Sequence, residues 1–259
     1  MNNLPAIFLS HGAPDLPIRK GAASDFLRSL HQQFPKPRAI LAISAHWYSD
    51  PPLVSAALHP KTIHDFSGFP EALYQLQYPA PGSPELADRV VALLKQSGIA
   101  CNTHPSRGLD HGTWTPLMLA YPDADIPVLQ LSIQYHRDPF YHWQLGQALA
   151  PLRQEDVLII GSGSATHNLY AFEANYDALP PLWVKQFDEW LAETIERRDW
   201  NCLIHYRNHA PYAQENHPTE EHLLPLFVAL GAAGANPKGR PLHRSYVYGA
   251  FSMAAYAFA

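Results

Sequence analysis

Histidine is the residue type whose placement in this chain suggests chemistry. His11, His46 and His167 each follow shortly after a short apolar run, the runs being AIFLS, AILAIS and VLIIG. A neutral imidazole offers one nitrogen lone pair, so several imidazoles together can bind a divalent transition metal. If the three runs are parallel strands, their carboxyl ends meet at one edge of a sheet. The sequence therefore predicts a metal site at that edge.

Two further histidines stand in sequence contexts that suggest a function. His111 lies in GLDHGTWTP, where Asp110 could orient an imidazole, although a loop that caps the following helix is an equally good interpretation. His222 lies in PTEEHLLPL. The glutamates there suit the first turn of a helix, whereas the histidine has no such explanation and could point into a site. The histidines around this segment are interpreted as structural: His205, His209 and His217.

The segments that must position these residues alternate between short apolar runs and amphipathic stretches. Strands are expected over Ala6–Ser10, Ala39–Ser44, Leu53–Leu58, Val128–Ile133 and Val157–Gly161. Helices are expected over Ser24–Phe34, Ser83–Gly98, Asp138–Leu152, Leu182–Arg198 and Thr219–Ala229. The tail, Ser245–Phe258, is expected to form a late or edge strand.

Apolar runs separated by helices are typical of βαβ units. We therefore predict an α/β fold in which a central, mostly parallel sheet is flanked by helices and carries the metal site at the carboxyl ends of its strands. No repeat, low-complexity tract or long linker interrupts the pattern. Residues 1–259 are expected to form a single catalytic domain.

The composition argues against several classes of partner. The chain has 18 Lys and Arg against 23 Asp and Glu, with no basic run, so a nucleic-acid partner is not expected. No apolar run approaches the roughly 18 residues of a membrane span, and the N-terminus lacks the basic region of a signal peptide. The two cysteines, Cys101 and Cys202, fit a reducing compartment. A cytoplasmic protein without a membrane partner is expected.

Other catalytic motifs are absent from the sequence. GSGSAT, residues 161–166, lacks the third glycine of a dinucleotide-binding loop, and no nucleophile elbow, P-loop or H-E-x-x-H is present. What remains is a histidine-rich site for one metal ion with aromatic side chains nearby in the sequence: Trp47, Phe66, Phe69 and Trp114.

Six motifs, in order along nearly the whole chain, resemble those of one enzyme family. They are SHGAP (10–14), SAHW (44–47), DFSGFP (65–70), GLDHGTWTPL (108–117), GSGSATHNL (161–169) and PTEEHLLPL (218–226). This set resembles the class III extradiol ring-cleavage dioxygenases, and within them the DOPA 4,5-dioxygenase subgroup. The resemblance implies an α/β fold with one active-site metal.

The resemblance also implies a role for each of five histidines. His11, His46 and His222 match the metal ligands. His167 matches the catalytic base, either acting as a base alone or also serving as a fourth ligand before substrate binds. His111 matches a second active-site histidine that steers substrate and oxygen. The substrates implied are a catechol such as L-DOPA and dioxygen.

The metal itself is less closely specified than its ligands. Many extradiol enzymes use two histidines and one carboxylate, whereas the third position here is His222. Fe(II) is expected for catalysis, and Zn(II) is plausible as the bound ion because it also suits imidazole ligands. Two alternatives are a zinc-dependent hydrolase and a relative that binds metal or peptide without catalysis. Arg107 and Arg244 are the candidates for holding a substrate carboxylate.

Overall fold

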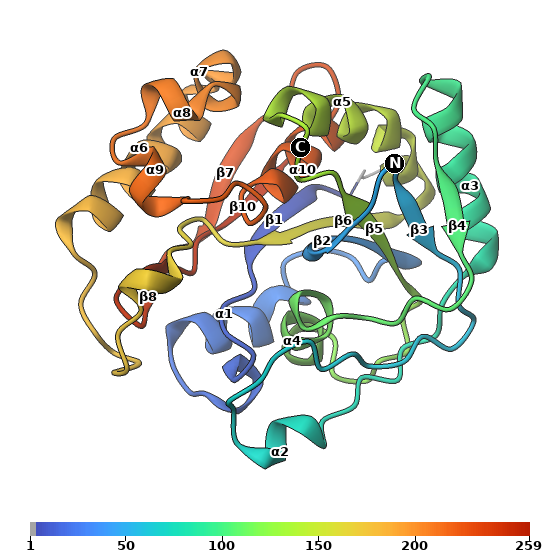
Figure 1. The fold of residues 1–259 in the computed structure, drawn as a ribbon. Helices are drawn as coiled ribbons and strands as arrows, with labels where there is room; N and C mark the ends of the chain where they lie inside the picture. Colours follow the sequence, from blue (N-terminus) through green and yellow to red (C-terminus); the bar gives the residue numbers. More distant parts are fainter. Residues whose placement is uncertain (1–3) are drawn as a thin grey trace.

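The computed structural model describes residues 4–259, which form an eight-stranded sheet with helices on both faces (Figure 1). Residues 1–3, part of the expected domain and of the segment compared above with a signal peptide, lie outside the described residues. The strand order is β4-β3-β5-β2-β6-β1-β10-β7.

The bounds of the elements follow the expected alternation. The strands are β1 (Ala6–Ser10), β2 (Ala39–Tyr48), β3 (Leu53–Ser55), β4 (Asn102–His104), β5 (Val128–Ile133), β6 (Val157–Gly163), β7 (Gly239–His243), β8 (Tyr246–Val247), β9 (Phe251–Ser252) and β10 (Ala255–Phe258). The helices are α1 (Ala22–Leu30), α2 (Glu71–Tyr74), α3 (Pro84–Gln96), α4 (His111–Ala120), α5 (Pro139–Leu149), α6 (Leu182–Arg197), α7 (Trp200–Ile204), α8 (Tyr206–His209), α9 (Ala213–Asn216) and α10 (Leu224–Ala232).

The middle of the sheet is parallel, as the sequence predicts. Strand β2 pairs in parallel with β5 and β6, and β6 pairs in parallel with β1. Every residue of β1, β5 and β6 is buried, which agrees with the mainly apolar sequences of these strands. The α/β fold with a mostly parallel central sheet is confirmed.

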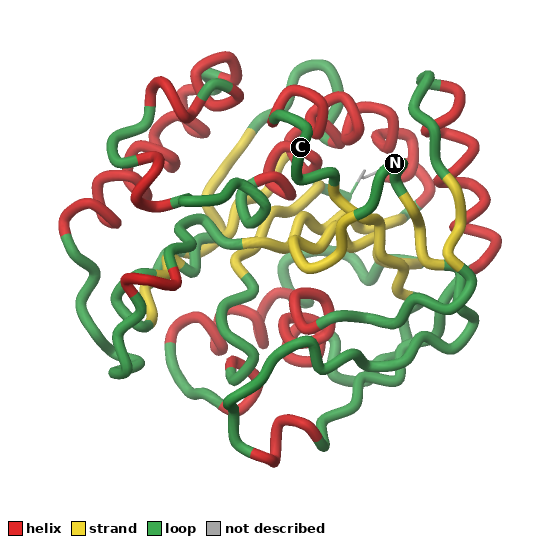
Figure 2. The backbone as a smooth tube through the Cα atoms, in the orientation of Figure 1, coloured by secondary structure: helices red, strands yellow, loops and turns green. Residues whose placement is uncertain are grey.

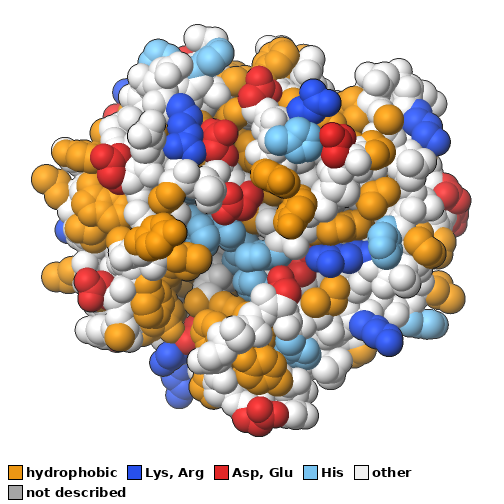
Figure 3. Space-filling model, viewed as in Figure 1, with side chains coloured by type: hydrophobic (Ala, Val, Ile, Leu, Met, Phe, Trp, Pro, Cys, Tyr) orange, Lys and Arg blue, Asp and Glu red, His pale blue; other side chains and the backbone are white. Residues whose placement is uncertain are grey.

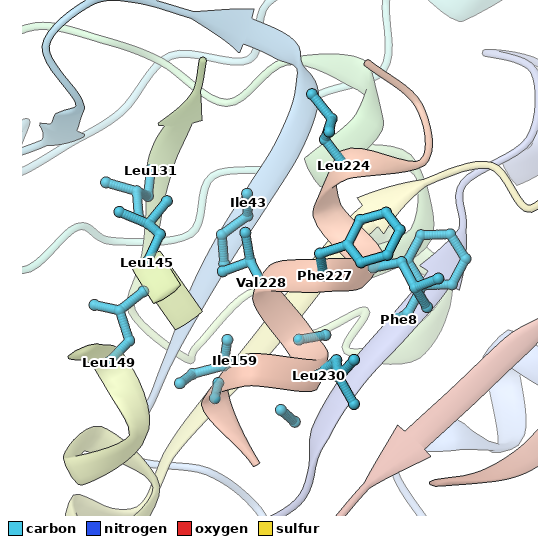
Figure 4. Close-up of a cluster of buried hydrophobic side chains, with 14 of the residues drawn as sticks. Phe8, Ile43, Leu131, Leu145, Leu149, Ile159, Leu224, Phe227, Val228 and Leu230 are labelled. Atoms are coloured by element: carbon cyan, nitrogen blue, oxygen red, sulfur yellow. The ribbon is translucent and has the colours of Figure 1, made fainter. Parts of the chain in front are cut away.

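Helices cover both faces of the strand layer (Figure 2). Helices α3, α5 and α10 pack in the core on one face, and α1 and α4 pack in the core on the other. Helix α10 is buried along its whole length, between the sheet and α5 (Figure 4). A helix that is apolar on all sides needs such a position. Its fixed placement matters because His222 lies just before it.

Three sequence predictions are corrected by the structure. The tail ends in a late strand, β10, as expected, but it is not an edge strand, because β10 lies inside the sheet, antiparallel between β1 and β7. The expected strand Leu53–Leu58 ends at Ser55 and pairs antiparallel with β5. The helix expected from Thr219 begins at Leu224, since Pro225 suits only its first turn.

Across residues 4–259, the helices are too short or too polar to cross a bilayer.

Candidate metal centre

Three histidines that are far apart in the sequence meet at the carboxyl ends of the central strands. His11 directly follows β1, His46 lies near the end of β2, and His222 lies in the turn before α10. The Nε2 atoms of His11 and His46 are 3.0 Å apart, and one nitrogen from each of the three rings lies within 4.8 Å of the others. Figure 3 shows histidine side chains gathered in a hollow on this face.

Hydrogen bonds hold two of these rings so that Nε2 faces the centre. His11 Nδ1 is 3.0 Å from Ser162 Oγ, and His222 Nδ1 is 3.0 Å from Glu221 Oε1. The buried Nε2 of His222 has no hydrogen-bond partner among residues 4–259. A buried polar atom without a partner is costly, and metal-binding histidines usually donate their other ring N–H to an oxygen. Both features fit a metal ion between the three rings.

The electrostatics of the cluster also fit a cation. Burial, and then the proximity of the other imidazoles, lowers the pKa of His11 and of His222 well below the usual value. Burial likewise lowers the pKa of His46 to about 3. These rings are therefore neutral at neutral pH, which leaves their lone pairs available. Metal–nitrogen bonds of about 2.1 Å would hold two donor nitrogens roughly 3 to 3.5 Å apart, and the 3.0 Å between His11 and His46 is compatible with that.

A glycine on β6 allows the turn that carries His222 to approach the sheet. Ser164 N donates a 2.9 Å hydrogen bond to the carbonyl oxygen of His222. A Cβ atom at Gly163 would lie 2.0 Å from that same carbonyl oxygen. Since real atoms do not approach so closely, any side chain at position 163 must change the packing of β6 against the His222 backbone.

Gly163→Ala is therefore expected to lower metal affinity by at least about 10-fold, the size of effect seen when the support of a metal ligand is lost. Competition with a chelator would measure it. Gly98→Ala is the control that shows whether a less stable fold alone lowers metal affinity. Its Cβ meets nothing within 4 Å, but φ is +76°, so alanine should cost about 1 kcal/mol of folding free energy while metal affinity stays unchanged. Equal metal affinities in the two variants would contradict this account.

His111 is held at the edge of the cluster by a carboxylate that the sequence analysis did not single out. Asp65 Oδ1 accepts hydrogen bonds from the backbone N–H of His111 at 3.0 Å and from its Nδ1 at 2.9 Å. Partial burial alone would raise the pKa of Asp65, but the hydrogen bonds from His111 lower it to about 2. Asp65 is thus an anion in contact with His111, the first residue of α4, where the helix dipole also favours negative charge.

The expectation that Asp110 orients an imidazole is wrong. Its carboxylate accepts hydrogen bonds from Ser44 at 2.7 Å, from Gln130 at 2.6 Å and from Arg107 at 2.9 Å. It also makes no side-chain cap at the start of α4. Asp110 is fully buried, and its contacts tie the helix to strands β2 and β5 instead. Sequence adjacency to His111 was therefore a misleading signal.

His167 lies beside His222 and outside the group formed by His11, His46 and His222; with Glu221 and His222 it makes another set of donors within 4.8 Å of one another. The two rings are stacked, with centroids 3.4 Å apart and planes 10° apart. Burial lowers the pKa of His167 to about 4. Among the three histidines that the sequence analysis interpreted as structural, His217 is buried, and its Nε2 is 2.9 Å from the carbonyl oxygen of Ala165.

The histidines form the floor of a cavity of about 280 Å³. This is near the lower end of the range for small-molecule pockets. Its remaining wall is mainly apolar: Ala13, Pro14, Phe66, Phe69, Leu169, Phe172 and Phe251. Of the four aromatic residues noted in the sequence, Phe66 and Phe69 line it; Trp47 and Trp114 do not.

Neither arginine suggested for a substrate carboxylate lines this cavity. Arg107 contacts Asp110 and the Trp47 ring, and Arg244 is bound to buried Asp188. The lining that the structure describes contains no lysine or arginine. The cavity therefore suits a flat apolar ring that reaches the histidine floor.

The family comparison agrees with this geometry. The model for the catalytic LigB subunit of aromatic ring-opening dioxygenases matches residues 5–259. The chain belongs to the LigB family.

Relatives of this LigB chain carry a more specific name. A 4,5-DOPA dioxygenase extradiol from Beta vulgaris is 49% identical over 97% of this chain and 95% of its own length. A protein of the same name from Escherichia coli is 39% identical over 88% and 85%. The crystal structure of an uncharacterized protein from Escherichia coli K12 superimposes with a TM-score of 0.82, at 32% identity over 98% and 99% of the two chains.

These relationships establish the type of reaction. The LigB-family chain is an extradiol ring-cleaving dioxygenase, an oxidoreductase acting on a small aromatic molecule and dioxygen, and the family implies a bound metal. They favour this function over the hydrolase and the non-enzymatic alternatives. They do so independently of the geometry of the histidines.

Three residues that support the site's histidines in this LigB chain were assigned no role at the site from the sequence. They are Asp65, Ser162 and Glu221. Asp65 is 46 residues from its partner His111, and Ser162 is 151 residues from His11. The available signal was their place inside the DFSGFP, GSGSATHNL and PTEEHLLPL motifs.

Proposed function

We propose that the chain carries out 4,5-extradiol cleavage of a catechol such as L-DOPA, with Fe(II) bound by His11, His46 and His222. The observation that carries the proposal is the convergence of three imidazoles at the floor of an aromatic-walled cavity. The names of the plant and bacterial relatives support the choice of L-DOPA. Zn(II) is also compatible with three imidazoles, so the metal that supports turnover needs a direct test.

When bound, the metal lowers the pKa of a catechol hydroxyl and brings the ring and dioxygen together. The protein's own part is to hold the ring and move protons. We propose that His111 and His167, on the floor of the cavity, exchange protons with the substrate. Because His167 lies outside the group formed by His11, His46 and His222, we propose that it acts as a base rather than as a permanent fourth ligand.

The apolar wall would hold the aromatic ring and exclude water from the reacting atoms. Phe66 and Phe251 both line the cavity, and the Phe66 ring packs beside His111 while the Phe251 ring packs beside His167. Since no cationic side chain among residues 4–259 lines the cavity, the amino acid end of L-DOPA would extend toward its mouth.

We also propose that residues 1–259 act as one catalytic domain. The strands and turns that carry the proposed ligands all belong to a single sheet and the helix packed on it, which supports this. A cytoplasmic location is part of the proposal. The two cysteines, both free, are compatible with it.

Oxygen uptake with L-DOPA and with simple catechols tests the function. The protein would be stripped of metal and reloaded anaerobically with Fe(II) or Zn(II). We expect uptake and a new yellow chromophore only with Fe(II). If Fe(II)-loaded protein of verified metal content consumed no oxygen with any catechol, the proposed substrate class would be wrong. Turnover that needs Zn(II) and no dioxygen would instead indicate a hydrolase.

A further inference from the structure

A single carboxylate oxygen holds His111 at two points. Asp65 lies in the connection between β3 and α2, and its Oδ1 accepts both the backbone N–H of His111 and the ring Nδ1, at 3.0 and 2.9 Å. The His111 side chain is almost buried, with 7% of its surface exposed. Both the start of α4 and the direction of the imidazole are thereby tied to one acceptor.

Distances show that Asp65 acts on His111 more than on the neighbouring ring. Its Oδ2 is 3.8 Å from His46 Nδ1, too far for a hydrogen bond. The other carboxylate near His111, Asp110, is occupied by Ser44 and Gln130. Among the residues that the structure describes, the carboxylate that contacts the His111 ring is therefore Asp65.

An ionised carboxylate can only accept hydrogen bonds. Its contact with Nδ1 therefore requires the proton of a neutral His111 to sit on Nδ1. The other nitrogen, Nε2, makes no hydrogen bond within residues 4–259, and the ring lines the cavity.

We propose that Asp65 is a positioning residue that keeps His111 in the Nδ1–H tautomer and so presents an unprotonated Nε2 to the bound substrate. This rests on the proposed function, since that is what places a catechol in the cavity. The step that follows is one proton transfer. A catechol O–H bond breaks, an Nε2–H bond forms, and the electron pair stays on the catechol oxygen. The positive charge that develops on the ring faces the Asp65 anion, which keeps its own charge.

The tautomer can be measured without turnover. Two-bond nitrogen–proton correlations of the Zn(II)-loaded protein, at mildly alkaline pH, distinguish Nδ1–H from Nε2–H, and a His111→Gln variant assigns the signal. We expect Nδ1–H in the unmodified protein and a mixture in Asp65→Ala. A His111 ring that carries a proton on Nε2 in the unmodified protein would overturn the proposal. This readout does not depend on whether the chain cleaves L-DOPA.

Kinetics of the Fe(II)-loaded enzyme give the second test. Asp65→Ala should lower kcat by about 10- to 100-fold, the usual effect of losing such a partner, with KM and iron content little changed. Asp65→Asn keeps a neutral acceptor and should recover part of the rate. Asp50→Asn removes the carboxylate of an exposed pair with His136, also at 2.9 Å, and should leave kcat unchanged.

The double variant decides whether Asp65 acts through His111. In a His111→Ala background, Asp65→Ala should cause no further loss of kcat, since the group it positions is gone. Multiplying losses would overturn the proposal, as would an Asn variant no better than Ala. Loss of iron from Asp65→Ala would identify Asp65 as a support for the metal, because it also lies near His46, and would overturn it as well.

Discussion

Replacing His11 by alanine is expected to abolish metal binding and, with it, oxygen uptake. His11 is 2% exposed, and its Nε2 lies 3.0 Å from Nε2 of His46, so its loss leaves the proposed site with two of its three imidazoles. Removing one of three ligands should lower metal affinity by more than about 100-fold, beyond the effect typical of outer partners. Metal content after loading and gel filtration, and the dissociation constant from chelator competition, would measure the loss.

Ser162→Ala is the matched comparison for His11→Ala. It leaves the His11 ring in place and removes only the hydroxyl that contacts Nδ1 at 3.0 Å. Metal affinity should fall by about 10-fold in this variant, far less than in His11→Ala. If His11→Ala retained full metal occupancy while its melting curve showed a folded protein, the three-histidine site would be wrong.

The strand-end histidines were accessible to prediction because topology alone brings them together. His11 follows β1 and His46 lies near the end of β2. These strands are the parallel neighbours of β6, and their apolar runs are easily recognised. A metal site at the carboxyl edge of the sheet follows from these facts without any knowledge of side-chain contacts. The sequence pattern was therefore enough to predict where in the fold the site lies.

The contacts that complete the site were not accessible in the same way. His222 reaches the cluster because Gly163 lets a distant turn approach within hydrogen-bond distance, and the sequence placed that residue in a helix instead. Asp65 lies in an irregular connection and contacts His111, which is 46 residues further along the chain. Such contacts depend on how irregular segments pack, which neither periodicity nor capping signals specify. The resemblance to a family identified the histidines, but it assigned no role to Asp65.

His111→Ala is expected to separate catalysis from metal binding. The ring lines the cavity but lies outside the group formed by His11, His46 and His222, so iron content should remain near that of the unmodified protein. Loss of a group that exchanges protons with the substrate should lower kcat by about 10²- to 10⁴-fold. Oxygen uptake at saturating L-DOPA, normalised to measured iron, would determine this ratio.

The control for this variant is His136→Ala, which removes an exposed histidine that is also paired with a carboxylate, outside the cavity lining. Its kcat should be unchanged, so a general effect of losing a His–Asp pair would be detected.

Full turnover by His111→Ala with normal iron content would remove His111 from proton transfer and leave that role to His167. Loss of iron would show instead that His111 supports the metal through its contact with the His46 ring, whose centroid is 3.9 Å away. The two outcomes differ in metal content, so a single preparation assayed for iron and for oxygen uptake distinguishes a proton-transfer role from a metal-supporting one.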